Sequence, residues 1–121
     1  MSASKPLERR GAARILKQLP LDVGHADGEF QTITRDLSTS GVYCTVSHFL
    51  APMTKLRIRL KLSSPGAAEM VSCEGIVVRI QPPAATPRRS HYDVAILFHD
   101  LSERSRLALS QYIQHHLHSP A

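Results

Sequence analysis

The sequence is poor in the residues that stack on nucleobases or cross-link small folds. Its 121 residues include no tryptophan, 5% aromatic residues and two cysteines, Cys44 and Cys73. The cysteines have no Cys-x-x-Cys spacing, so they predict neither a zinc site nor a redox motif. Both lie in apolar patterns typical of strands, where we expect them to act as small buried hydrophobic side chains.

Long hydrophobic runs are also absent. No apolar segment approaches the length of a membrane helix, and residues 1–17 are charged and lack the apolar centre of a signal peptide. We therefore expect no membrane span and a cytoplasmic location. The length suits a single domain over residues 1–121, with flexible ends at 1–7 and 119–121.

The clearest strand pattern carries a basic face. Residues 55–62 read Lys-Leu-Arg-Ile-Arg-Leu-Lys-Leu, which alternates cations with aliphatic residues. This period predicts a strand with its aliphatic side chains toward a core and Lys55, Arg57, Arg59 and Lys61 toward solvent. The outward cations form either a solvated surface or a surface for nucleic acid, a membrane or an acidic partner protein.

Apolar alternation and turn residues predict six strands in all: 16–23, 31–36, 41–46, 54–62, 71–80 and 92–98. The first is interrupted by Pro20. Six short strands indicate a mainly β fold, a six-stranded antiparallel barrel.

The period changes after the last strand. Ser102 is a suitable N-cap for a helix over 103–118, whose apolar stripe comprises Leu109, Ile113 and Leu117, flanked by Leu107 or Tyr112. This C-terminal α-helix should pack on the barrel or close one of its mouths. Histidines 115, 116 and 118 near its end predict a polar tail and no metal site.

Two short motifs carry the chemistry. Residues 9–14 read Arg-Arg-Gly-Ala-Ala-Arg, and residues 36–41 read Asp-Leu-Ser-Thr-Ser-Gly. Guanidinium groups bind phosphate oxygens or the O6/N7 edge of guanine, and a carboxylate accepts the N1–H and N2–H donors of guanine. Ser38 can donate or accept, and Gly41 permits a positive φ or a close backbone approach. The motifs favour a ligand that carries guanines and phosphates, although the second could also be a turn that bonds its own backbone.

With both motifs in this order, the chain resembles the PilZ domain family, whose members typically bind cyclic di-GMP. The resemblance covers about residues 7–117. It implies that Arg10 and Arg14, on a mobile clamp segment over 8–15, hold the ligand against a platform of Asp36, Ser38 and Gly41 on the barrel.

Two further positions follow from the resemblance. An additional arginine before the clamp, here Arg9, accompanies binding of an intercalated ligand dimer in this family, although Arg9 could equally be a solvated charge. Ala95 stands where many members have glycine, which could narrow the pocket slightly.

The expected function is that of a non-catalytic receptor that passes the cyclic di-GMP signal to a partner protein. The sequence offers no paired carboxylates, no nucleophile with a base, no phosphodiesterase metal motif and no cofactor motif. Two alternatives remain. One is a ligand-independent PilZ-like adaptor that acts by protein contacts. The other is a basic barrel for single-stranded nucleic acid, which the scarcity of aromatic residues disfavours.

Overall fold

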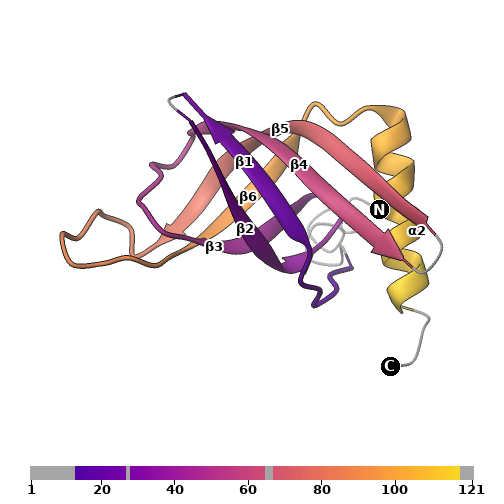
Figure 1. Cartoon of the computed structure of the whole chain (residues 1–121), viewed down its shortest axis with the longest axis horizontal. Helices are drawn as coiled ribbons and strands as arrows, with labels where there is room; N and C mark the ends of the chain where they lie inside the picture. The colour runs from indigo at the N-terminus through magenta and orange to yellow at the C-terminus, as the bar shows by residue number, and fades with distance from the viewer. Residues whose placement is uncertain (1–12, 27, 65–66, 118–121) are drawn as a thin grey trace, which may run out of the picture.

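Six antiparallel strands close a barrel, and a helix follows them (Figure 1). The computed structural model describes residues 13–26, 28–64 and 67–117. Within these ranges the strands are β1 (Pro20–His25), β2 (Gly28–Leu37), β3 (Gly41–Val46), β4 (Lys55–Ser64), β5 (Ala67–Gln81) and β6 (Tyr92–His99), and helix α2 (Glu103–Leu117) follows them. Their order around the barrel is β1-β2-β3-β6-β5-β4. The predicted fold class is confirmed.

The core follows from the period-two pattern. On β4, Leu56, Ile58 and Leu60 are buried, whereas the four cations that alternate with the aliphatic residues are exposed. Leu60 pairs with Leu21 on β1 and with Val71 on β5, so residues that face inward on neighbouring strands meet inside the barrel. The prediction for this strand is confirmed.

The predicted start of the first strand is wrong. The strand begins at Pro20 and does not include residues 16–19. Proline has no N–H to donate, so it is suited to the first position of a strand and not to its middle. The residues before it instead lie beside β2, where Ile15 exchanges backbone hydrogen bonds of 2.9 Å with Leu37.

Helix α2 lies at one end of the barrel, beside the adjoining ends of β4 and β5 (Figure 1). Its buried side chains are Leu109, Tyr112 and Ile113, and the Tyr112 hydroxyl donates to the carbonyl of Ser63 at 3.2 Å. Leu107 and Leu117 are 59% and 48% exposed. The stripe is therefore completed by Tyr112, and the predicted place of Leu117 in it is wrong because the last turn extends beyond the barrel surface.

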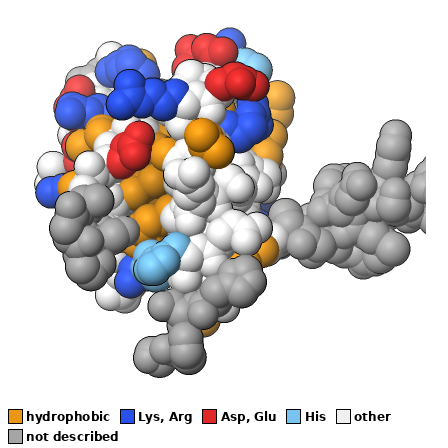
Figure 2. Space-filling view, turned by 90° about the vertical axis from the view of Figure 1, so that its right-hand side faces the viewer, with side chains coloured by type: hydrophobic (Ala, Val, Ile, Leu, Met, Phe, Trp, Pro, Cys, Tyr) orange, Lys and Arg blue, Asp and Glu red, His pale blue; other side chains and the backbone are white. Residues whose placement is uncertain are grey.

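The face seen from the helix side combines apolar and charged groups. Hydrophobic side chains gather in its middle, with basic and acidic side chains above them (Figure 2). Among the described residues, no helix is long and apolar enough to cross a membrane.

Ser102 caps α2 as predicted. The N–H of Ser105 donates to the Ser102 hydroxyl at 3.1 Å, which satisfies one of the free donors of the first turn. We expect Ser102→Ala to lower the free energy of unfolding by about 1 kcal/mol, measured by urea denaturation. Ser102→Asp, which retains an acceptor, should remain close to the native value. An alanine variant as stable as the native chain would contradict the capping role.

Candidate functional site

The two sequence motifs meet at β2. Nη1 of Arg14 lies 2.6 Å from Oδ1 of Asp36, and their side chains are 54% and 20% exposed. Arg14 therefore reaches the Asp-x-Ser-x-x-Gly motif directly. Arg9 and Arg10 lie outside the described residues.

The backbone beside Arg14 is held against β2 by hydrogen bonds. Besides the pairing of Ile15 with Leu37, the Thr34 hydroxyl donates to the carbonyl of Lys17 at 2.6 Å and accepts from the N–H of Leu19 at 3.0 Å. Thr34 is completely buried, so these bonds are shielded from water. They fix the chain on both sides of the exposed Leu16 and keep Arg14 close to Asp36.

A β-bulge brings the acidic group to the surface. The register of β2 against β3 shifts between Thr34 and Asp36, and Thr34 and Leu37 both face the core. Strict alternation would turn only one of two intervening residues outward. The bulge turns both Arg35 and Asp36 to the outer face.

A second bulge lies on β5. Its register against β6 shifts between Val77 and Arg79. Val77 and Ile80 face the core, while Val78 and Arg79 are exposed. The two bulges therefore add outward side chains on both sides of β3 and β6.

Between the bulges, four residues form a row across four strands. Asp36 pairs with Tyr43, Tyr43 with Ala95, and Ala95 with Arg79. All four line a hollow of about 540 Å³ together with Arg14, Val42 and Val78. The small Ala95 side chain lies between the larger Tyr43 and Arg79, so it forms a low floor in the middle of the row.

Tyr43 and Arg79 were not identified by the sequence analysis as site residues. Neither residue belongs to the two motifs. A strand predicted from simple alternation, without bulges, gives no reason to place Arg79 beside Ala95. Tyr43 is also held from the side, because the Arg35 guanidinium lies 5.2 Å from its ring centroid. Arg35 in turn forms an ion pair of 2.9 Å with Asp93.

Ser38 lies inside the turn between β2 and β3. Its side chain is completely buried, and its hydroxyl accepts from the N–H of Ser40 at 3.1 Å and lies 3.0 Å from the Ser40 hydroxyl. The backbone N–H of Ser38 donates to the carbonyl of Gly41 at 3.0 Å. In this geometry Ser38 orders the turn that follows Asp36.

Gly41 permits a close approach of two strands. A Cβ at this position would lie 2.2 Å from the carbonyl oxygen of Ile96 on β6. Of the two reasons that the sequence offered for this glycine, the structure supports the close backbone approach. The turn thus ends where β3 joins β6, next to the row that carries Tyr43 and Ala95.

The comparisons with known proteins agree with this architecture. A family model described as "PilZ domain" matches residues 8–115. The chain belongs to the PilZ domain family. This is a family of cyclic di-GMP receptors, and its domains are generally non-catalytic binding or adaptor domains. No relative is found among curated proteins.

Two solved structures share the PilZ fold with this chain. One is the Bacillus subtilis inhibitor of motility MotI/DgrA, with a TM-score of 0.75 and 19% identity, covering 93% of this chain and 54% of MotI. The other is the PilZ domain of CeSA from a cellulose-synthesizing bacterium, with a TM-score of 0.60 and 20% identity, covering 88% of this chain and all of that domain (100%). The chain therefore spans about half the length of MotI.

The described residues of this PilZ domain contain no cluster of three or more histidine, cysteine or acidic side chains that could hold a metal ion. His116 instead contacts its own helix, with Nδ1 lying 2.9 Å from the carbonyl oxygen of Tyr112. His118 lies outside the described residues.

Both cysteines are free thiols of low reactivity. Burial, and secondarily the charge of Asp93, raises the pKa of Cys44 to about 12. Burial raises the pKa of Cys73 to about 11. A backbone hydrogen bond at His99 opposes this shift, and the charges of Asp100 and Glu74 add smaller increases. Since the thiolate is the reactive form, neither cysteine is a candidate nucleophile.

The raised thiol pKa values predict a response to pH. At pH 8 we expect slow labelling of the native chain by a thiol reagent and rapid labelling of both cysteines in urea. Above about pH 9 the unfolded thiols ionise while the folded ones stay protonated, so the free energy of unfolding should fall as the pH rises. Cys44→Ala should reduce that slope. Rapid labelling of the native chain at pH 8 would contradict the raised pKa values of the two thiols.

Proposed function

We propose that this PilZ domain is a non-catalytic receptor for cyclic di-GMP that passes the signal to a partner protein. The observation that carries the proposal is the contact of Arg14 with Asp36, because it unites the arginine motif and the Asp-x-Ser-x-x-Gly motif at one hollow. We further propose that the domain acts in the cytoplasm.

The pair leaves binding capacity on both partners. Among the described residues, Asp36 accepts only through Oδ1, and Arg14 donates only through Nη1. Oδ2 of Asp36 can then accept from N1–H or N2–H of a guanine, while the other guanidinium nitrogens of Arg14 meet a phosphate. Arg10 supplies the second arginine of the clamp.

Tyr43 and Arg79 extend the proposed contacts across the row. Asp36 and Arg79 are three strand spacings apart, or about 14 Å along the sheet. Such a distance suits an elongated ligand that offers hydrogen-bond donors to Asp36 at one end and an anionic or acceptor group to Arg79 at the other. Arg79 can bind a phosphate or the O6/N7 edge of a guanine, and the Tyr43 ring offers a stacking face between the two ends.

The turn residues have supporting roles in the proposal. Ser38 already bonds to Ser40, so a direct contact of its hydroxyl with guanine would replace that bond. Gly41 keeps β3 close to β6 and thereby holds the row of platform residues together.

Calorimetric titration with cyclic di-GMP tests the proposal. We expect binding near two nucleotides per chain, as an intercalated dimer gripped in part by Arg9, and no binding of GTP. Arg9→Ala should lower the stoichiometry toward one while binding persists. Absence of heat with cyclic di-GMP, confirmed by a second binding assay, would overturn the receptor function. Binding of one nucleotide per native chain would overturn only the proposal that the ligand binds as an intercalated dimer.

A further inference from the structure

A second charged surface lies across the barrel from the candidate site. The basic row consists of Lys55, Arg57, Arg59 and Lys61, which all point outward from β4. In the closed order β1-β2-β3-β6-β5-β4, β4 occupies the position opposite β3, the strand that carries Tyr43. The basic row is therefore separated from the proposed ligand by the barrel core.

The cations of the basic row are not neutralised by the acids beside them. Asp22 on β1 pairs in register with Arg59, and Glu74 on β5 pairs with Arg57. Nevertheless, none of the four cations forms an ion pair within 4.0 Å in the described part of the chain, where the pairs are Arg14–Asp36, Arg35–Asp93 and Arg104–Glu69. Their charges remain available to a partner.

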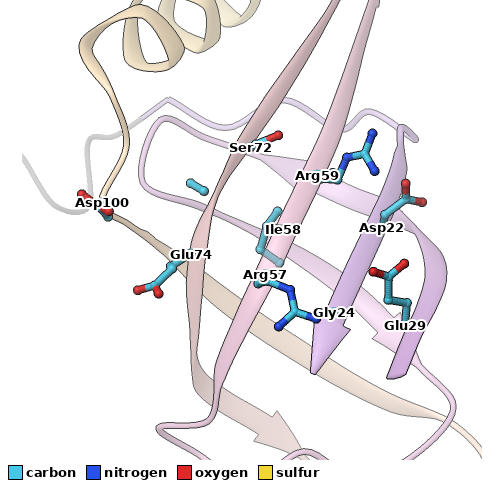
Figure 3. Close-up of a pocket in the computed structure, with 10 residues that line it drawn as sticks. Asp22, Gly24, Glu29, Arg57, Ile58, Arg59, Ser72, Glu74 and Asp100 are labelled. Carbon is cyan, nitrogen blue, oxygen red and sulfur yellow. The ribbon is translucent and has the colours of Figure 1, made fainter. Parts of the chain in front are cut away.

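Gly24 makes room for the Arg57 side chain on the same surface. It lies between Arg57 and Glu29 in one cross-strand line, and a Cβ at Gly24 would lie 2.8 Å from Nη2 of Arg57. Figure 3 shows the Arg57 side chain reaching toward Gly24, with Glu29 beyond it. A hollow of about 450 Å³ on this surface is lined by Gly24 and Arg57 and also by Asp22, Arg59 and Glu74. The missing side chain thus allows the Arg57 side chain to lie over Gly24 on β1.

The arrangement of charges selects one kind of partner. Alternate residues of a strand are about 6.6 Å apart, so the basic row is about 20 Å long. Carboxylates on both sides of it repel a broad polyanion such as nucleic acid or an anionic membrane. They tolerate a narrow line of negative charge, especially one with basic groups beside it.

We propose that the basic row is a docking surface for a partner protein that presents a line of carboxylates. Arg57 and Arg59 lie at its centre, where guanidinium groups can bind carboxylates bidentately. The hollow beside Arg57 and Arg59 admits a side chain between the flanking acids. Because this surface is separate from the candidate site, the proposal does not depend on cyclic di-GMP binding.

The test uses the full chain and a labelled peptide of five Thr-Glu repeats, which presents glutamates at every second position. Its isomer with five threonines followed by five glutamates has the same charge. By fluorescence anisotropy at low salt, we expect the alternating peptide to bind about fivefold more tightly than its isomer. Arg59→Glu should lower the affinity for the alternating peptide by about tenfold or more, because it replaces an attraction with a repulsion.

Arg88→Glu is the matched control, since it makes the same charge change at an exposed position in the loop before β6. It should alter peptide binding by less than about twofold, the expectation for long-range charge alone. Circular dichroism establishes that each variant is folded, and Arg59→Gln replaces Arg59→Glu if the latter is not.

Several results would overturn the proposal. These are no binding of the alternating peptide, equal binding of the two isomers, or equal losses in the Arg59 and Arg88 variants. Two polyanions serve as competitors of the proposal: a decathymidine oligonucleotide and vesicles containing phosphatidylserine. If either bound the native chain more tightly than the alternating peptide, and Arg59→Glu abolished that binding, the basic row would be assigned to a polyanion instead. Because no cyclic di-GMP is added, failure here leaves the receptor function intact.

Discussion

Asp36→Ala should lower the affinity for cyclic di-GMP by roughly tenfold to more than a hundredfold. Loss of a hydrogen bond to a charged group costs about 1.5–3 kcal/mol, which corresponds to this range. The substitution also releases Arg14, whose Nη1 lies 2.6 Å from the Asp36 carboxylate. Calorimetry on the folded variant measures both the lost guanine acceptor and the loosened clamp.

Asp22→Ala is a suitable control because it removes a carboxylate from β1, a strand that contributes no residue to the row or to the hollow of the candidate site. It should leave the affinity within about twofold of the native value. Arg14→Ala should resemble Asp36→Ala. If Asp36→Ala and Arg14→Ala both bound cyclic di-GMP normally, the hollow at β2 would not be the ligand site.

Gly41→Ala should destabilise the fold by about 3 kcal/mol or prevent folding. The added Cβ would lie 2.2 Å from the Ile96 carbonyl oxygen, which is backbone within the β3–β6 pairing and cannot rotate away. Overpacking typically costs about 1–3 kcal/mol, and contact with a fixed backbone atom belongs at the upper end. Urea denaturation monitored by circular dichroism measures the loss.

Gly28→Ala is the control for this change. A Cβ at Gly28 would have no atom within 4 Å, so stability should stay within about 0.5 kcal/mol of the native value. A Gly41→Ala chain as stable as Gly28→Ala would show that β3 and β6 can separate without cost. The role of Gly41 would then have to lie with the ligand.

Much of the fold could be predicted because its strands follow simple alternation. β3 coincides with the predicted strand, and β4 differs from it only at its ends. The sequence predicted that Gly41 serves either a positive φ or a close backbone approach. Only the cross-strand neighbour Ile96 distinguishes these two roles. The prediction of where β1 starts was wrong because apolar residues before Pro20 pack on the barrel without forming part of β1.

The candidate site was predicted only where it lies in local motifs. Arg14 and Asp36 could be named from the sequence, but their contact depends on the pairing of Ile15 with Leu37. Arg79 reaches the site through a bulge and a pairing with Ala95, and neither is encoded in a short pattern. Register between distant strands is a property of the closed barrel, so the row appears only in three dimensions.

Amide chemical-shift mapping with cyclic di-GMP tests the central claim most directly. On titration of the labelled full chain, we expect the largest shifts along the row from Asp36 through Tyr43 and Ala95 to Arg79, and in the turn at Ser38–Gly41, with small shifts on β4. Saturating shifts at these positions would place the ligand in the hollow between the two bulges. Shifts confined to β4, or none at millimolar ligand, would contradict the account.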